Sequence, residues 1–251
     1  MTASSQPETS TLKAPLIDRL ARLVDLTARE RAYLGQVQVE FARVHAGTDI
    51  ITAGHAYRCF FILNQGLAMR YKVLHDGRRQ ILSLVMPGDF IGFPGCLFER
   101  SLYSIASLTE AVTCTISFNV LFDLFRRHPK LGAAFFWLSG HETALIAEHL
   151  VGVGRQSAYE RVARLLMELL VRLQNAGLAD ERSYSLPMTQ ELMADALGLS
   201  VPHVNRTLRK LREDGLIDLQ GSRITCLDVP ALSRLADFDG ANLAGQRIPG
   251  L

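Results

Sequence analysis

Residues 189–215 constrain the fold of this chain most strongly, because their apolar positions recur with the period of an α-helix on both sides of a glycine. Thr189 and Ser200 stand where the two helices would begin, and a hydroxyl there can accept from free N–H groups of the first turn. Gly198 falls between the helices, where a sharp turn needs a positive φ that is unstrained only for glycine. The stretch predicts a helix-turn-helix whose second helix covers residues 201–214. The expected packing positions are Met193, Ala194, Leu197, Leu199, Val204 and Leu208.

The second helix has one apolar face and one polar, cationic face, which favours insertion into the major groove of DNA. We expect Arg206 to bind guanine, because a guanidinium can donate to both O6 and N7. His203 and Asn205 would also face the groove, whereas Arg209 and Lys210 would hold phosphates. An ordinary helical hairpin with a solvated charged face is the alternative. The expected DNA-binding residues are Thr189, Ser200, Val201, Pro202, His203, Asn205, Arg206, Arg209, Lys210 and Arg223.

Residues 216–227 predict two short strands joined by a tight turn at Gln220-Gly221-Ser222. A short hairpin directly after such a helix is typical of a wing. Arg223 lies beside the turn and could touch a phosphate, although a solvated surface arginine is the simpler interpretation. Asp228 can cap one last short helix that has Pro230 in its first turn.

Length and charge limit the classes of function. A chain of 251 residues can bury a core in one large or two modest domains. The net charge of +2 is small, so any nucleic-acid surface must be local. No apolar run approaches ~18 residues and the first ten residues do not form a signal peptide, so we expect a cytoplasmic protein without a membrane partner. The four cysteines form no CxxC pair, which predicts thiols rather than a metal site.

The N-terminal part shows two different patterns. Pro15–Leu26 has apolar residues at helical spacing, and Thr27–Glu30 is a capping box that would open a second short helix. From about Val39 to Ser117, short β-branched and aromatic runs are separated by turn residues, which predicts an antiparallel roll with a hairpin turn at Asp76-Gly77. The expected strands are Ile50–Thr52, Cys59–Leu63, Leu67–Leu74, Arg78–Val85, Ser104–Leu108 and Val112–Ser117.

A long helix should follow a short amphipathic helix at residues 118–128 and run from Pro129 to about Val151. It carries two apolar faces, so we expect one to pack on the roll and the other on a second copy of the chain; burial inside a monomer is the alternative. The segment Val151–Arg155 contains two glycines, each of which weakens a helix by roughly 1 kcal/mol, and is the expected hinge. The expected dimer seam, spaced like a coiled coil, is Leu131, Phe135, Leu138, Glu142, Leu145 and His149.

The patterns together predict an α+β protein with four segments. They are N-terminal helices and a roll at 1–128, a dimerisation helix and hinge at 129–156, a winged helix-turn-helix at 157–240, and a loose tail at 241–251.

This order of elements resembles the CRP/FNR family of bacterial transcription regulators over about Ile17 to Leu235. The segments that carry the resemblance are Asn64-Gln-Gly66, Asp76-Gly-Arg-Arg-Gln-Ile81, Pro87-Gly-Asp-Phe-Ile-Gly92 and the helix-turn-helix, and the middle two look like the alphaproteobacterial branch. The resemblance implies a jelly-roll-type β-roll of the cyclic-nucleotide-binding kind and a homodimer, not an enzyme, that binds a near-palindromic operator in double-stranded DNA. RNA polymerase would be a further partner of an activator.

Some positions depart from the family pattern. Phe93 stands where cAMP-binding members have a glutamate, and their phosphate-holding arginine would fall near Leu102 or Tyr103. No cysteine precedes Cys59, unlike in the iron–sulfur members, so we expect no cofactor. An unidentified signal would then act at the roll. The expected effector pocket consists of Phe93, Gly95, Cys96, Arg100, Tyr103 and Ser104.

Two alternative functions are compatible with the sequence. A cyclic-nucleotide-responsive regulator and a cupin-like small-molecule-binding protein are the alternatives. A cupin enzyme needs clustered metal ligands, and His45, His55 and His75 lack the spacing of an HxH pair, so we expect no metal and no catalytic residue. Cys96 could be a redox sensor or a small buried apolar residue. The sequence does not determine the effector, the operator or the sign of regulation.

Overall fold

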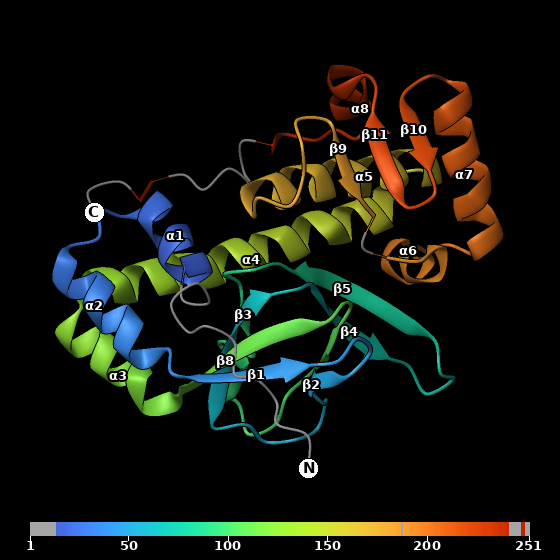
Figure 1. Cartoon of the computed structure of the whole chain (residues 1–251). Helices are drawn as coiled ribbons and strands as arrows, with labels where there is room; N and C mark the ends of the chain where they lie inside the picture. Colours follow the sequence, from blue (N-terminus) through green and yellow to red (C-terminus); the bar gives the residue numbers. More distant parts are fainter. Residues whose placement is uncertain (1–13, 187, 241–246, 249–251) are drawn as a thin grey trace, which may run out of the picture. The chain divides into compact units, whose positions relative to one another are not determined.

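The computed structural model describes residues 14–186, 188–240 and 247–248, and Figure 1 shows their helices and strands. The chain divides into two compact units. Unit 1 comprises Met1–Ala68, Val85–Gly140 and Arg247–Leu251, and unit 2 comprises Met69–Leu84 and His141–Gln246. This division differs from the expected one, because most of one hairpin of the roll is grouped with the C-terminal helices and the long helix is divided near its middle.

The elements follow the predicted order, with helices at the start, then the strands of the roll, and then further helices. The helices are α1 (Ala14–Leu23), α2 (Ala28–Val37), the 3-10 helix η2 (Gly95–Leu97), α3 (Phe118–Arg127), α4 (Pro129–Arg155), α5 (Ala158–Asn175), α6 (Gln190–Leu197), α7 (Val201–Glu213) and α8 (Val229–Leu235). The strands are β1 (Glu40–Val44), β2 (Asp49–Ile51), β3 (Cys59–Gln65), β4 (Ala68–Val73), β5 (Arg79–Val85), β6 (Phe90–Ile91), β7 (Ser104–Ser107), β8 (Ala111–Ser117), β9 (Ser183–Ser185), β10 (Ile217–Gln220) and β11 (Arg223–Cys226).

The strands form three sheets, ordered β1-β8-β3-β6, β2-β7-β4-β5 and β10-β11-β9. The central strand β8 pairs antiparallel with β1, where Glu40 lies opposite Thr115, and with β3, where Cys59 lies opposite Ser117. All six expected strands are confirmed to within two residues at either end. The sequence missed β1, β6 and β9, because they are very short or lack an alternation of apolar and polar residues.

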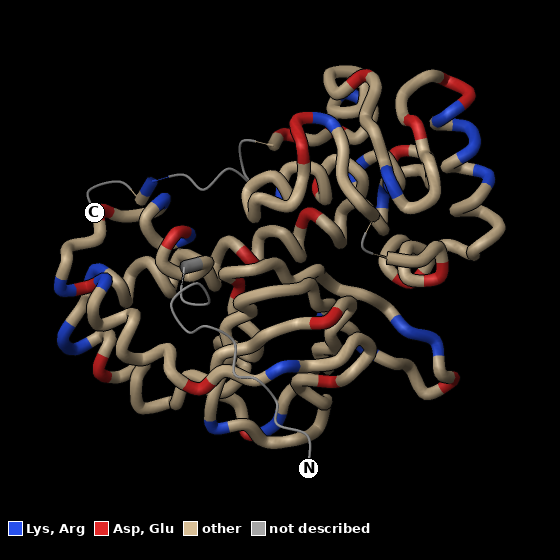
Figure 2. Tube along the Cα trace, viewed as in Figure 1, with Lys and Arg blue, Asp and Glu red and all other residues tan. Residues whose placement is uncertain are grey.

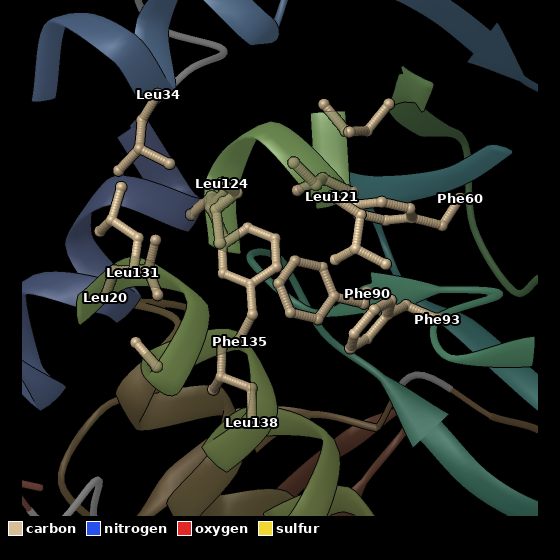
Figure 3. Packing of buried hydrophobic residues seen from close by; sticks show 14 of the residues in the cluster. Leu20, Leu34, Phe60, Phe90, Phe93, Leu121, Leu124, Leu131, Phe135 and Leu138 are labelled. Carbon is tan, nitrogen blue, oxygen red and sulfur yellow. The ribbon is translucent and has the colours of Figure 1, made fainter. Parts of the chain in front are cut away.

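The core of unit 1 is an aromatic cluster that gathers side chains from the roll and from α4. Phe60, Phe90, Phe93 and Phe135 meet with ring centroids 4.6 to 6.4 Å apart, mostly edge to face or tilted. Figure 3 shows Phe135 of α4 reaching these rings, with leucines of α1, α2 and α3 around it. The first part of α4 is therefore a core helix of this unit.

This packing corrects the expected dimer seam. Leu131, Phe135 and Leu138 are 0%, 3% and 4% exposed and belong to the core cluster of unit 1, so they cannot form a free seam. The spacing correctly identified an apolar face, but the roll covers it, since burying such side chains gains about 1.5–3 kcal/mol each. The exposed positions of α4 are instead Pro129, Phe136, Gly140, Thr143, Ala144, Ala147, Glu148, Leu150, Val151, Gly154 and Arg155.

The expected hinge at Val151–Arg155 is also corrected, because α4 continues through both glycines to Arg155. The backbone N–H of Gln156 still donates to the carbonyl of Gly152 at 3.0 Å. The helix ends where Ser157 takes an extended conformation and forms a capping box with Glu160 at the start of α5. A strong N-cap, rather than glycine, decides this boundary.

Unit 2 is built around α5, which packs against α6, α7, α8 and β9. The buried Tyr184 of β9 donates its hydroxyl hydrogen bond to the carbonyl of Leu166 in α5 at 3.0 Å. Within the described ranges, no helix has the length and apolar character needed to cross a membrane. Of the tail that was expected to be loose, only Arg247 and Ile248 are described, and both contact unit 1.

We predict that Leu138→Ala lowers the free energy of unfolding by about 2–5 kcal/mol, because it leaves a cavity in the aromatic cluster. Denaturant unfolding followed by circular dichroism measures this change. Leu102→Ala is the matched control, since Leu102 belongs to the same unit and is 63% exposed. Equal, small effects of the two changes would contradict the placement of Leu138 in the core.

Candidate nucleic-acid interface

The helix-turn-helix forms from α6 and α7 as the sequence predicts. Thr189 caps α6 and accepts from the N–H of Leu192 at 3.3 Å. Gly198 ends this helix in the left-handed region, with φ 63° and ψ 36°, and its N–H donates to the carbonyl of Ala194. This turn directs the chain into α7 at Val201, and the small Ala194 is buried as expected.

The two faces of α7 separate cleanly. Val204, Thr207, Leu208 and Leu211 are buried against the rest of unit 2, and the Thr207 hydroxyl donates to the carbonyl of His203 at 2.8 Å. The opposite face is polar and exposed, and Figure 2 shows basic segments along α7. Of the residues predicted to bind DNA, those of α7 that are exposed are Pro202, His203, Asn205, Arg206, Arg209 and Lys210. Thr189, Ser200 and Arg223, which lie outside α7, are exposed as well, and Val201 is half-buried.

The start of α7 differs from the expectation in one respect. Ser200 is the N-cap residue, but its side chain makes no capping hydrogen bond, and its carbonyl accepts from His203 and Val204. Pro202 lies in the first turn and has no N–H to satisfy. The positive end of the helix dipole at Val201 and the uncommitted hydroxyl of Ser200 are suited to an anion such as a phosphate.

Lys210, one of the cations predicted to bind DNA, already has an acidic partner within the chain. Lys210 pairs with Asp214 at 3.3 Å and lies 5.4 Å from the ring centroid of Tyr159. The Tyr159 hydroxyl donates to the same carboxylate, which lowers the pKa of Asp214, while burial and then Asp214 raise the pKa of Tyr159 to about 12.

Arg223 behaves in the same way at the wing. The wing is the hairpin of β10 and β11, in which Gln220 lies opposite Arg223 and Gly221 has a φ of 60°. Arg223 donates to Asp180 and to the hydroxyl of Ser183, and so joins the wing to β9. Across the part of the chain that the structure describes, the side chains of Arg206 and Arg209 have no ion pair of this kind.

A polar brace that the sequence did not reveal holds α6 within unit 2. Arg79 of β5 donates through Nε and Nη2 to Asp195 of α6, both at 2.8 Å. The neighbouring Gln80 uses its amide to bridge the carbonyls of Ala196 at 3.1 Å and Ile81 at 3.0 Å. The partners are separated by 116 residues, so no local pattern could identify them.

Residues of α4 and α5 line a small, partly open pocket of about 20 Å³, large enough for one water molecule. His149 of α4 and Gln156 line it, and His149 Nε2 and Gln156 Oε1 have no hydrogen-bond partner within the described chain. Burial lowers the pKa of His149, and Arg164 lowers it further. Glu168 and the carbonyls of Ala196 and Ile81 act in the opposite direction.

Comparison with known proteins identifies both halves of the chain. The family model of the Crp-like helix-turn-helix domain matches residues 160–235, and that of the cyclic nucleotide-binding domain matches residues 41–128. The nitrogen fixation regulation protein FixK of Azorhizobium caulinodans is 35% identical over 176 residues, which cover 70% of each chain. FixK of Bradyrhizobium diazoefficiens is 31% identical over 213 residues, which cover 83% of this chain and 85% of that one.

The chain belongs to the CRP/FNR family of transcription regulators. The structure of FixK2 from Bradyrhizobium japonicum has the same fold, with a TM-score of 0.69 and 24% identity over 78% of this chain and 96% of that one. The predicted family, fold class and DNA-binding helix-turn-helix are therefore confirmed.

Two of the residues predicted to line an effector pocket of this CRP/FNR protein belong to the same buried cluster of unit 1. Phe93 packs among the aromatic rings of that cluster, and burial of Cys96 raises the pKa of its thiol to about 11. Arg100 is exposed and donates to the carbonyl of Gly54 at 3.3 Å. The shared effector pocket stays a prediction, with Phe93 and Cys96 packed in the core of unit 1 and Arg100 on its surface.

The other three members of the predicted pocket lie close in sequence to these but are held by their own contacts. Ser104 is buried, and its hydroxyl accepts from the N–H of Ala53 at 3.0 Å. A Cβ added at Gly95 would lie 3.1 Å from the hydroxyl of Tyr103, so the two residues are in close approach. Thiolate chemistry at Cys96 is disfavoured by its raised pKa.

Two of the remaining seam residues of the CRP/FNR long helix face groups of unit 2. Glu142 forms a 2.5 Å ion pair with Arg70 of β4, whose side chain is 4% exposed, and His149 lines the small pocket. Leu145 is half-buried, and its place in a dimer seam stays a prediction.

We predict that the stability of the protein depends on pH through His149. Because the pKa of His149 is lowered in the folded state, its contribution is complete above about pH 6.5 and is lost as the pH falls through the lowered pKa. Protonation would add a positive charge beside Arg161 and Arg164 of α5, with Glu168 of α5 and Glu148 of α4 only partly compensating.

The measurement is urea unfolding of the wild type and His149→Gln between about pH 7.5 and about pH 5. The wild type should lose more free energy of unfolding over this interval than the variant. His75→Gln, at an exposed position of the same unit, should keep the wild-type pH dependence. Identical profiles for wild type and His149→Gln would rule out this role.

Proposed function

We propose that the protein acts as a homodimer that binds a near-palindromic DNA operator, with α7 of each subunit in the major groove. The observation that carries this proposal is the exposed polar face of α7. Arg206 and Arg209 on this face have no acidic partner within the described chain, whereas Lys210 on α7 and Arg223 on β11 are bound to carboxylates. A two-fold axis would place two such helices about one helical turn of DNA apart, roughly 34 Å.

Arg206 is the proposed base-reading residue. It lies in the N-terminal half of α7, next to Asn205 and near His203, and all three side chains are exposed. A guanidinium can bind guanine bidentately, and an amide can bind adenine in the same manner. Ser200, Val201 and Thr189 at the two helix starts would approach the phosphate backbone.

Arg209 is the proposed phosphate anchor. Lys210 and Arg223 are weaker candidates than the sequence suggested, because each would have to leave an acidic partner to bind a phosphate. Releasing Arg223 would also disturb its link to β9, where Asp180 and Ser183 hold it and where these hydrogen bonds lower the pKa of Asp180.

The exposed face of α4 is the proposed dimer surface. Its positions follow one another in steps of four and three, the spacing of a coiled-coil seam. Phe136 and Leu150 are 73% and 70% exposed, and Gly140, Ala147 and Gly154 are small enough for two helices to approach closely. This face replaces the seam expected from the sequence.

The signal that controls the protein is proposed not to be a cyclic nucleotide. Phe93 occupies the position of a ribose-binding glutamate and is committed to the aromatic core, while Arg100 is exposed and bound to a carbonyl. A buried phosphate would need a cationic or N–H cradle, which these residues do not supply. We also propose that the protein is not an enzyme, acts in the cytoplasm, and contacts RNA polymerase if it is an activator.

We predict that Arg206→Ala costs about 1–3 kcal/mol of binding free energy on the preferred site and relaxes the preference at one symmetric base-pair position. The preferred site would first be selected from random duplexes with the full-length protein. Fluorescence anisotropy titrations on that duplex and on a scrambled duplex would then measure both losses.

Arg209→Ala is the matched comparison on the same helix face. It should weaken binding to both duplexes alike and reduce the salt slope by about one unit. A uniform loss for Arg206→Ala on selected and scrambled DNA would show that this residue is another phosphate contact.

We predict that Ala147→Asp combined with Leu150→Asp converts the dimer into monomers, because two carboxylates per chain would face their copies across the interface. Light scattering coupled to size exclusion measures the mass. Leu178→Asp, at a position of unit 2 that is 50% exposed, should leave the dimer intact. A dimeric double variant would place the interface elsewhere.

A further inference from the structure

We infer that the corner between α1 and α2 is a docking site for the chain's own C-terminal segment, Arg247–Ile248, which we call the strap. These two residues follow the last helix of unit 2 in sequence, yet they contact unit 1. Figure 1 shows this short segment beside α1. The inference concerns how the two units are joined and does not rest on the proposed DNA contacts.

The strap completes the C-terminal end of α1. The backbone N–H of Ile248 donates to the carbonyl of Leu23 at 3.0 Å, and Leu23 is the last residue of that helix. The final carbonyls of a helix have no partner within the helix, so an incoming N–H satisfies a group that water would otherwise solvate. This hydrogen bond fixes the backbone of the strap against the corner.

The side chain of Ile248 adds an apolar contact. It is half-buried and packs against the core cluster that contains Leu16, Leu20 and Leu23 of α1 and Leu34 of α2. Packing Ile248 on the core removes its apolar surface from water, and this burial stabilises the docked position of the segment.

Charge sets the register of the strap. Arg247 forms an ion pair with Asp25, which follows α1, and the carbonyl of Asp25 accepts from Lys130 of α4. Lys130 also pairs with Glu30 of α2 at 2.9 Å, so the corner is held from three helices. The Arg247–Asp25 pair is exposed and therefore contributes orientation more than stability.

The strap is one of four places where the chain passes between the two units. The other three are the two ends of Met69–Leu84 and the middle of α4, whereas the strap follows α8, the last helix of unit 2. A docked strap restrains the freedom of that unit, and release of the strap removes the restraint. We propose that the strap acts within one chain, as the contacts show.

The first test is the double variant Asp25→Cys/Arg247→Cys, treated with a short bismaleimide cross-linker in the full-length protein. The Arg247–Asp25 ion pair is made by the end of a long arginine side chain, so a linker is needed to replace its reach. Mass spectrometry should find the peptides that contain residues 25 and 247 linked within one chain, and Asp25→Cys alone is the matched control that should not link them. Covalent dimers on a denaturing gel, or no link between these peptides, would overturn docking within one chain.

The second test is hydrogen exchange of full-length Ile248→Asp. Loss of the half-buried isoleucine contact should speed amide exchange around residues 23–26 by about fivefold, while amides in α5 and α7 keep their rates. Ile248→Val keeps most of the apolar surface and should exchange like the wild type. Unchanged exchange at residues 23–26 in Ile248→Asp would overturn the inference.

Discussion

The burial of one face of α4 in the aromatic cluster of unit 1 is the contact on which the assignment of surfaces depends. Phe135 packs among Phe60, Phe90 and Phe93, and this packing fixes the rotation of the helix about its axis. The opposite face, with Phe136 and Leu150, is then necessarily exposed. One set of core contacts therefore decides which face of the first part of α4 is buried, and it places Phe93 in the core of unit 1.

Polar contacts dominate where unit 2 positions its DNA-binding helices. Arg79 and Gln80 bind α6 at Asp195 and Ala196, and His149 lies beside the same carbonyl groups. Such contacts are directional, so they orient a helix more sharply than apolar packing does. His149 Nε2 and Gln156 Oε1 have no hydrogen-bond partner among the described residues, so the contacts around α6 are sensitive to protonation and to the presence of a water molecule.

The cations of the DNA-binding unit differ in whether an acidic side chain already pairs with them. Lys210 and Arg223 have acidic partners within a few ångströms, whereas Arg206 and Arg209 do not within the described chain. A phosphate must compete with a carboxylate for Lys210 and Arg223, but it meets no such competitor at Arg206 and Arg209 within the described chain. The small net charge of the whole protein thus conceals a local difference in the availability of positive charge.

The sequence by itself determined the features that short-range interactions control. The helix-turn-helix, the Gly198 turn, the caps at Thr27, Ser157 and Asp228, and the Asp76-Gly77 hairpin all follow from residues a few positions apart. Only the tertiary structure decided which apolar face of α4 is buried, that α4 continues through Gly152, that Phe93 joins the core, and where Ile248 docks. The physical reason is that periodicity reveals an apolar face but not the surface that will cover it, since that surface comes from residues distant in sequence.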